Sequence, residues 1–280
     1  MTDRCVPKFG VDAVPYAGCD GWASRDFPTT GSSEEDMAVN GVDREHDAPM
    51  VTVTVVYHSV HGHTRVLAEH LADGARLVPG ARVHLVEIRA EDVTAGRWHD
   101  AEVLALLERS DAIVLGCPTL MGSVSAVFKA FMEAAFTPFT TQAWKDKLAG
   151  GFTMSASQSG DKLVVLEQLA VFAAQLGMQW IGVGDMPGNN WSGGARDDVN
   201  RLGSWLGLMS QSHADQGPEH AGSRGDRITA ERYGERIARL TQRWVNAVPY
   251  DTSRMTEHEA RALSASLRET GDAPAALTGA

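Results

Sequence analysis

The stretch Val51-Thr-Val-Thr-Val-Val-Tyr57-His-Ser59-Val-His61-Gly62-His63-Thr64 decides the fold of this chain. Its first seven residues are apolar or β-branched, which predicts a buried β-strand. A short polar turn with one glycine follows, and the run from Thr64 to Ala75 has the periodicity of a helix. Free backbone N–H groups in such a turn lie at the positive end of the helix dipole, so the stretch predicts an anion site.

The kind of anion follows from the composition of this first turn, residues 59–64. The turn contains no Lys or Arg, so a phosphate would be held by neutral amides and by the hydroxyls of Ser59 and Thr64. A nucleotide triphosphate needs G-x-x-x-x-G-K-[ST] and a dinucleotide needs G-x-G-x-x-G, and the turn has neither motif. A single phosphate monoester, as in FMN, fits such a cradle. From the turn alone, a plain strand-to-helix connection is an equally good interpretation.

The composition of the chain excludes several classes of function. The chain has 280 residues, 43% hydrophobic, and a net charge of −11, which argues against a nucleic-acid partner. No apolar run approaches the ~20 residues that a membrane span needs. The three cysteines show no disulfide framework or zinc spacing, and the two loop histidines lack further ligands at metal spacing, so we expect a cytoplasmic protein without a metal.

The two ends of the chain differ from its middle. Residues 1–49 hold ten acidic and four basic residues and are rich in Gly, Pro and Ser, which predicts a disordered acidic leader. This leader is either a regulatory tail or the result of an over-extended start codon assignment. Residues 249–280 form a tail in which Thr256 and Glu259 mark the start of a short helix.

Strands and helices alternate through the middle of the chain. Further strands are predicted at 82–88, 111–116, 148–154 and 179–183, with helices at 101–109, 125–135, 163–176 and 229–245. This alternation predicts an α/β three-layer sandwich with a five-stranded parallel sheet and helices on both faces. Five such alternating units fit the strand order 2-1-3-4-5. This order places a ligand crevice beyond the carboxyl ends of the strands. An insertion of about residues 185–227, with a helix over 197–209, precedes the closing helix.

Two more turns are therefore expected at the same crevice. The second turn, residues 116–123, follows the third strand and contains Pro118 and Gly122. The third turn, residues 154–161, follows the fourth strand and is small and polar. Such a polar turn is common on protein surfaces, so its position is what gives it meaning.

The three turns together resemble those of flavodoxin-like proteins, and are most similar to the NAD(P)H:quinone oxidoreductases of the tryptophan-repressor-binding-protein (WrbA-like) type. The resemblance implies a flavodoxin-like domain over residues 50–248 that binds FMN and takes electrons from NAD(P)H. The cofactor-binding residues that it implies are Ser59, Val60, His61, Gly62, His63, Thr64, Pro118, Thr119, Leu120, Met121, Gly122, Ser155, Ala156, Ser157, Gln158, Ser159 and Gly160.

Three positions depart from the pattern of that family. Leu120 and Met121 stand where the family usually has Arg and an aromatic residue, and Leu176 stands where it often has His. Phe139 aligns with a family Trp that reaches a neighbouring subunit's flavin. We expect Phe139 and Trp191 to contribute to the substrate pocket.

The function that the resemblance implies is an FMN-dependent oxidoreductase that passes electrons from NAD(P)H to a quinone or a similar small acceptor. Since the flavin carries the redox chemistry, no catalytic acid, base or nucleophile is assigned. A flavodoxin that exchanges single electrons with protein partners is the alternative, as is a scaffold of the same fold without cofactor. Trp144, Trp205 and Phe139 lie in predicted peripheral segments, which suits a homo-oligomer, either a dimer or a tetramer. A place in the core is an equally good interpretation of these apolar residues.

Overall fold

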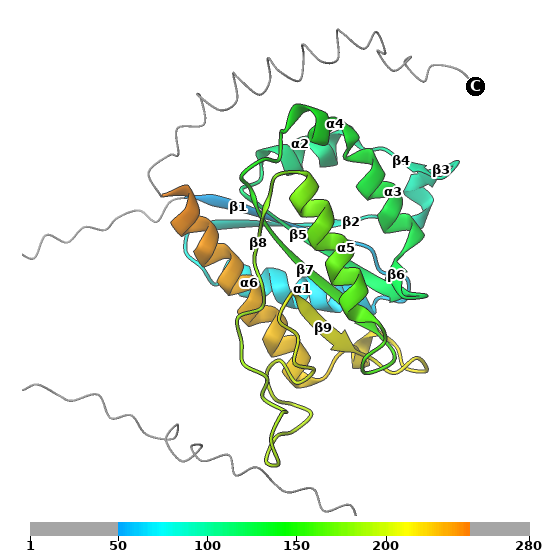
Figure 1. Ribbon diagram of the computed structural model, residues 1–280, viewed down its shortest axis with the longest axis vertical. Coiled ribbons are helices and arrows are strands. Elements are labelled where there is room, and N and C mark those ends of the chain that lie inside the picture. The colour runs from blue at the N-terminus through cyan, green and yellow to red at the C-terminus, as the bar shows by residue number, and fades with distance from the viewer. Residues whose placement is uncertain (1–49, 247–280) are drawn as a thin grey trace, which may run out of the picture. The chain divides into compact units, whose positions relative to one another are not determined.

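The computed structural model of the protein describes residues 50–246 (Figure 1). The predictions for the acidic leader and for the tail helix at 256–259 lie outside this range. The strands of the main sheet are β1 (Val51–Tyr57), β2 (Ala81–Glu87), β5 (Ala112–Leu120), β6 (Ser123–Val124), β7 (Leu148–Ser155), β8 (Gln179–Trp180) and β9 (Leu208–Gln211). Two short strands, β3 (Val93–Thr94) and β4 (Arg97–Trp98), pair with each other.

The main sheet has the order β2-β1-β5-β7-β8, with these neighbours parallel. This is the predicted order 2-1-3-4-5, and the flavodoxin-like α/β sandwich is confirmed. The unbroken apolar runs of β1 and β5 suit strands that are covered on both faces.

Helices cover both faces of the sheet (Figure 1). On one face, α1 (His63–Arg76) and α6 (Arg224–Val245) pack on Val53 and Val55 of β1. On the other face, α2 (Ala101–Arg109), α3 (Ala126–Ala134) and α5 (Lys162–Gln175) pack around Val56. The remaining short helices are η1 (Ala90–Asp92), α4 (Phe136–Thr141) and η2 (Pro218–His220).

The fifth position of the sheet is interrupted. β8 pairs with the start of β7 for only two residues, and β9 pairs with the end of β7 after the chain has made an excursion. The helix predicted over 197–209 is wrong, because this segment contains turns followed by β9. Asn200 explains the difference: its left-handed backbone and its side-chain bonds to Asp185 and Ser204 replace helical hydrogen bonds.

The helix starts fall into two kinds. The side chains of Asp100, Ser125 and Ser223 accept backbone N–H groups at the starts of α2, α3 and α6. By contrast, α1 and α5 begin after Gly62 and Asp161, which have left-handed backbones and make no side-chain cap. The two uncapped helix starts follow the first and third turns, and of the first amides of α1 only that of Arg65 donates to a side chain, Oγ of Ser59, within residues 50–246.

Candidate functional site

The three predicted turns lie at one edge of the sheet. Tyr57 at the end of β1 is level with Gly116, and Pro118 in β5 is level with Met154 at the end of β7. A Cβ placed on Gly122 of the second turn would be 4.0 Å from the Cβ of Asp161 in the third turn. The parallel strands therefore deliver the three turns to adjoining positions at their carboxyl ends.

The first turn presents unpaired donors. Within residues 50–246, the backbone amides of residues 59–64 have no hydrogen-bond acceptor, while the amide of Arg65 donates to Oγ of Ser59 at 3.2 Å. Thr64 is only 2% exposed, and its hydroxyl also has no partner in this part of the chain. Such a concave row of amides at a helix start is a site for an anion.

Within the described residues, 50–246, no Lys or Arg side chain is bonded to the first turn. The guanidinium of Arg65 is paired with the carboxylate of Glu87 at 2.7 Å, on the β2 side. Nε2 of His63 lies 2.8 Å from the carbonyl oxygen of Gln216. A phosphate in this cradle would meet neutral donors and the helix dipole.

Gly62 sets the shape of the first turn. Its φ of 81° lies in the left-handed region, which disfavours other residues. A Cβ at this position would come within 2.9 Å of the Cβ of Pro218 in η2. Glycine is therefore required both by the backbone and by the close packing of η2 against the turn.

The second turn is a tight hairpin rather than an open loop. β5 continues to Leu120 and pairs with β6, so that Met121 and Gly122 form the tip with φ values of 50° and 72°. Two positive φ values are typical of a type I′ hairpin turn. Met121 is fully exposed at the tip and Leu120 is nearly half exposed, so both side chains are free to cover a ligand ring.

Beneath the hairpin, hydroxyls join β5 to β7. The hydroxyls of Thr119 and Thr153 lie 2.9 Å apart, and that of Thr153 donates to the carbonyl oxygen of Cys117 at 2.7 Å. Cys117 is buried, and burial raises the pKa of its thiol to about 12. The thiol is therefore protonated at neutral pH and packs as a small apolar side chain.

The third turn is held from the inside by Lys162, the first residue of α5. The Lys162 ammonium donates to Oγ of Ser155 at 2.9 Å and to the carbonyl oxygens of Ser157 and Gln158 at 2.7 and 2.9 Å. The residue has no exposed surface. Burial lowers the pKa of Lys162 to about 8, with Asp226 raising it and Arg201 lowering it further.

The returning strand β9 closes the third turn on its outer side. The side-chain amide of Gln211 in β9 donates to the carbonyl oxygen of Ala156 at 2.9 Å. Behind it, Arg201 and Asp226 form an almost fully buried ion pair of 2.7 Å. The insertion thus supports the third turn through β9 and this ion pair.

A cavity of about 420 Å³ adjoins the first and second turns. Its wall includes Ser59, Val60 and Leu120, together with His58 and Ser125, whose Nδ1 and Oγ atoms lie 2.7 Å apart. Burial lowers the pKa of His58 below its usual range, so its imidazole is neutral at pH 7. This cavity gives a ring-shaped ligand room beside the phosphate cradle.

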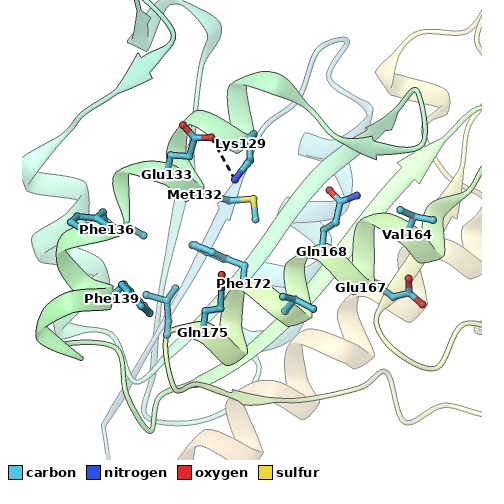
Figure 2. Close-up of a pocket in the computed structure, with 13 residues that line it drawn as sticks. Lys129, Met132, Glu133, Phe136, Phe139, Val164, Glu167, Gln168, Phe172 and Gln175 are labelled. Carbon is cyan, nitrogen blue, oxygen red and sulfur yellow. Dashed lines mark ion pairs between the residues drawn. The ribbon is translucent and has the colours of Figure 1, made fainter. Parts of the chain in front are cut away.

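The two residues predicted for the substrate pocket lie elsewhere in the chain. Phe139 belongs to α4 and lines a groove between α3 and α5, together with Phe136 (Figure 2). Trp191 is 69% exposed in the excursion between β8 and β9, where its ring N–H donates to the carbonyl oxygen of Gly188. The fold brings neither residue to the three turns of the same chain.

Sequence reasoning missed three residues at the site. His58 and Ser125 stand next to predicted positions, but only the pairing of β1 with β5 shows that they meet. Lys162 falls between the third turn, residues 154–161, and the helix predicted over 163–176, and it is the first residue of α5. A lysine at that place is a detectable signal, because a cation is unfavourable at the positive end of a helix dipole.

These features fit FMN. A row of unpaired amides beside the hydroxyl of Thr64 suits one phosphate, and an adjoining cavity lined by Leu120, close to the exposed hairpin tip, suits an aromatic ring. The absence of a Lys or Arg in the first turn excludes a triphosphate loop. Fold and site together define a flavodoxin-like protein that binds FMN.

Comparison with known proteins gives the family. Residues 51–192 match the family of NADPH-dependent FMN reductases, and this chain belongs to that family. It is therefore an NAD(P)H-dependent flavin oxidoreductase by family, and the resemblance to the WrbA-like proteins is confirmed.

Individual relatives are named as flavodoxins or as NAD(P)H dehydrogenases. The chain is 38% identical to "Flavodoxin FldP" of Pseudomonas aeruginosa over 69% of this chain and 98% of that protein. It is 28% identical to an NAD(P)H dehydrogenase (quinone) of Azorhizobium caulinodans, over 66% and 100% of the two chains. Among solved structures, a flavodoxin, WrbA-like protein from Agrobacterium tumefaciens is 35% identical, with a TM-score of 0.53, over 69% and 98% of the two chains.

Proposed function

We propose that the protein uses FMN to pass electrons from NAD(P)H to a quinone or a similar small acceptor. The observation that carries this proposal is the convergence of three turns at one sheet edge, with unpaired amides in the first turn. The relative from Azorhizobium caulinodans, named an NAD(P)H dehydrogenase (quinone), supports the choice of acceptor.

In the mechanism, the chain's own residues bind, orient and shield. The amides of residues 59–64 and the hydroxyls of Ser59 and Thr64 would hold the phosphate. The hairpin from Pro118 to Gly122 and the third turn from Ser155 to Gly160 would frame the ring. Bound FMN supplies the redox chemistry by accepting a hydride equivalent and giving up electrons.

The wall of the adjoining cavity has a neutral side, with His58, Leu120 and Ser125, and a charged side, with Arg65, Glu87, Arg89 and Glu91. The imidazole of His58 is held against the Ser125 hydroxyl, and Leu120 covers the side of the hairpin. We assign no proton transfer to His58, because its ring is fixed by this contact and is buried. Its role is to join the first turn to the segment that follows the hairpin.

Anaerobic mixing of the FMN-loaded protein with NADH or NADPH tests the proposal. The flavin absorbance near its visible maximum is expected to bleach with at least one donor, and a quinone added afterwards is expected to restore it. Failure of both donors to bleach the flavin would reject the oxidoreductase.

A flavodoxin that carries electrons between proteins is the second candidate. The 38% identical relative named a flavodoxin favours it, as does the lack of a basic residue at Leu120 and Met121. This candidate predicts no reduction by either nicotinamide and fast reduction by a protein partner. Purified protein that is colourless and does not respond to added FMN would instead indicate a scaffold without cofactor.

We also propose a homo-oligomer, either a dimer or a tetramer. The groove of about 620 Å³ between α3, α4 and α5 exposes Phe136 and Phe139 at one end and Val164 at the other (Figure 2). Gln168 in this groove also bonds Ser123 of the hairpin, so Phe139 lies at the end away from the turns. Because Phe139 lies away from the turns of its own chain, it can contribute only to an acceptor pocket at the turns of a second subunit.

Light scattering tests the oligomer. The double substitution Phe136→Glu and Phe139→Glu is expected to give a monomer that still binds FMN. A wild-type monomer would contradict the proposal. Trp191 stays a prediction for the substrate pocket, to be tested by the acceptor KM of Trp191→Ala.

The location is proposed to be the cytoplasm. Within residues 50–246, no helix combines the length and apolarity needed to cross a bilayer. Cys117, the cysteine in this part of the chain, is a free thiol, which suits a reducing compartment. Fractionation of cells is the direct test.

A further inference from the structure

Lys162 is a buried cation without a carboxylate partner. All three of its N–H groups are used by neutral oxygen atoms of the third turn: Oγ of Ser155 and the carbonyl oxygens of Ser157 and Gln158. Among the salt bridges of residues 50–246, none involves Lys162. Within this part of the chain, the groups that bond to its ammonium are therefore neutral dipoles.

This placement is costly for the protein alone. Burial disfavours the charged form, and the first position of α5 is at the positive end of the helix dipole. The negative charge of Asp226 favours the protonated form of Lys162, but this carboxylate is already paired with Arg201. A neutral side chain of similar size would fill the same space, but it would leave three oxygen atoms of the third turn without this donor.

The contacts of Lys162 determine which way the third turn faces. In a planar trans peptide, the carbonyl of one residue and the N–H of the next point in opposite directions. Because the carbonyls of Ser157 and Gln158 point inward to Lys162, the N–H groups of Gln158 and Ser159 point away from it. These two amides have no acceptor within residues 50–246.

We propose that Lys162 is a positioning residue for the flavin: it turns the amides of the third turn toward the FMN ring and places a positive charge beneath that turn. This inference rests on the proposed function. Reduced flavin carries more negative charge than oxidised flavin, and charges near the ring tune its redox properties. The positive charge of Lys162 therefore makes the protein bind reduced FMN more tightly than oxidised FMN. This preference favours the transfer of electrons from a nicotinamide to the flavin.

The charge of Lys162 also couples FMN binding to pH. The charged groups that face it are Asp226 of α6 and Arg201 of the excursion, which form a pair, and the neighbouring Asp161 is exposed. Because burial lowers the pKa of Lys162 to about 8, the free protein loses this proton at mildly alkaline pH. A bound anion opposes that loss, so FMN affinity falls as pH rises above 8.

The test compares Lys162→Met, which removes the charge, with Lys162→Arg, which keeps it. FMN affinity is measured by flavin fluorescence, and the midpoint potential is measured by anaerobic titration with a reference dye. We expect Lys162→Met to lose at least about tenfold of the preference for reduced FMN, equivalent to about 30 mV for two electrons. Lys162→Arg is expected to retain that preference.

The pH series gives a second readout. From pH 7 to pH 9, the wild-type Kd for FMN is expected to rise by up to about tenfold, while that of Lys162→Met stays nearly level. This series on the wild-type protein remains informative even if a variant fails to fold.

Lys147 supplies a matched control. Its ammonium also donates to two carbonyl oxygens, those of Glu108 and Ser110, and burial lowers its pKa. It precedes β7 and so lies at the opposite edge of the sheet from the turns. Lys147→Met is expected to leave both the potential and the pH dependence of FMN binding unchanged.

Two outcomes overturn the inference. An unchanged midpoint potential in Lys162→Met, or an equal change in Lys147→Met, would show that Lys162 has only a structural role. A wild-type Kd that is level from pH 7 to pH 9 would also contradict it. Wild-type protein that binds no FMN would instead remove the proposed function itself.

Discussion

The first and third turns have the same place in the fold but are built in opposite ways. Each connects a parallel strand to a helix whose start has a left-handed backbone and no side-chain cap. Among residues 50–246, the first turn has unpaired amides and no Lys or Arg bonded to it. The third turn has carbonyl oxygens that are bound from below by Lys162.

This difference shows two ways to make a turn present donors. In the first turn, glycine at position 62 and the contact with Pro218 fix the backbone, and the amides have no internal partners. In the third turn, a buried ammonium draws the carbonyls inward, so the amides face outward. The first turn is therefore sensitive to backbone changes, and the third turn is sensitive to the charge of one side chain.

Changing Gly62 to Ala is expected to have the largest effect. A side chain there meets a left-handed φ of 81° and the ring of Pro218, so several amides of the first turn would move. FMN affinity is expected to fall about 100-fold, which corresponds to about 2.7 kcal/mol.

The control for that variant is Gly96→Ala. Gly96 has a similar φ of 75°, but open space surrounds it. This variant should lose some thermal stability and keep its FMN affinity. If Gly62→Ala bound FMN with wild-type affinity, the backbone conformation of the first turn would not be required for FMN binding.

The Thr64 hydroxyl gives the next largest effect. Since it has no partner within residues 50–246, Thr64→Val is expected to leave the stability of the FMN-free protein nearly unchanged. FMN affinity should fall about tenfold, because a hydrogen bond to a charged group contributes about 1.5 kcal/mol. Isothermal titration and urea unfolding measure the two quantities.

Thr54→Val is the matched control for the hydroxyl. The Thr54 hydroxyl lies 2.8 Å from that of Ser110 and is buried, far from the three turns in the strand register. It should lose about 1 kcal/mol of stability with no change in FMN affinity. An equal loss of affinity in both variants would contradict the role of Thr64.

The pH dependence of stability tests the third turn in the absence of FMN. The pKa of Lys162 is about 8 in the folded protein and higher in the unfolded chain, so the unfolded chain binds more protons above pH 8. The free energy of unfolding from this group therefore rises with pH, by about 1 kcal/mol between pH 7 and pH 9. Urea unfolding of wild type and Lys162→Met, compared at both pH values, should show this difference.

Met121 is expected to have the smallest effect. It is fully exposed at the hairpin tip with a φ of 50°, a conformation that Asn adopts more readily. Met121→Asn should raise the melting temperature slightly. It should weaken FMN binding by a factor of about two to ten, through loss of a sulfur contact with the ring of about 0.3–1.5 kcal/mol. Unchanged binding would indicate that the tip does not cover the flavin.

The fold was predictable because local and long-range signals agree over most of the chain. β-Branched runs such as residues 51–57 and the alternation of strands with helices determine a parallel sheet, and the three turns follow from its topology. The turns in place of the helix expected over 197–209 were not predictable, because Asn200 bonds Thr229 and Arg201 pairs with Asp226, and both partners are distant in sequence.

The site was only partly predictable for a similar reason. Turn residues are marked by Gly, Ser and Thr in the sequence, whereas the contact of His58 with Ser125 depends on strand register. The inward direction of the Lys162 side chain depends on the path of residues 155–158 around it. Phe139 lies in a groove away from the turns, and this position depends on tertiary packing that its aromatic character alone does not predict.

The most direct test of the central claim is the relative affinity of the wild-type protein for FMN and for riboflavin, which differ in the phosphate. If the neutral donors of residues 59–64 bind that phosphate, the protein should bind FMN at least about 100-fold more tightly than riboflavin. Thr64→Val should then weaken the binding of FMN but not that of riboflavin. Equal affinity of the wild-type protein for the two flavins would contradict the account.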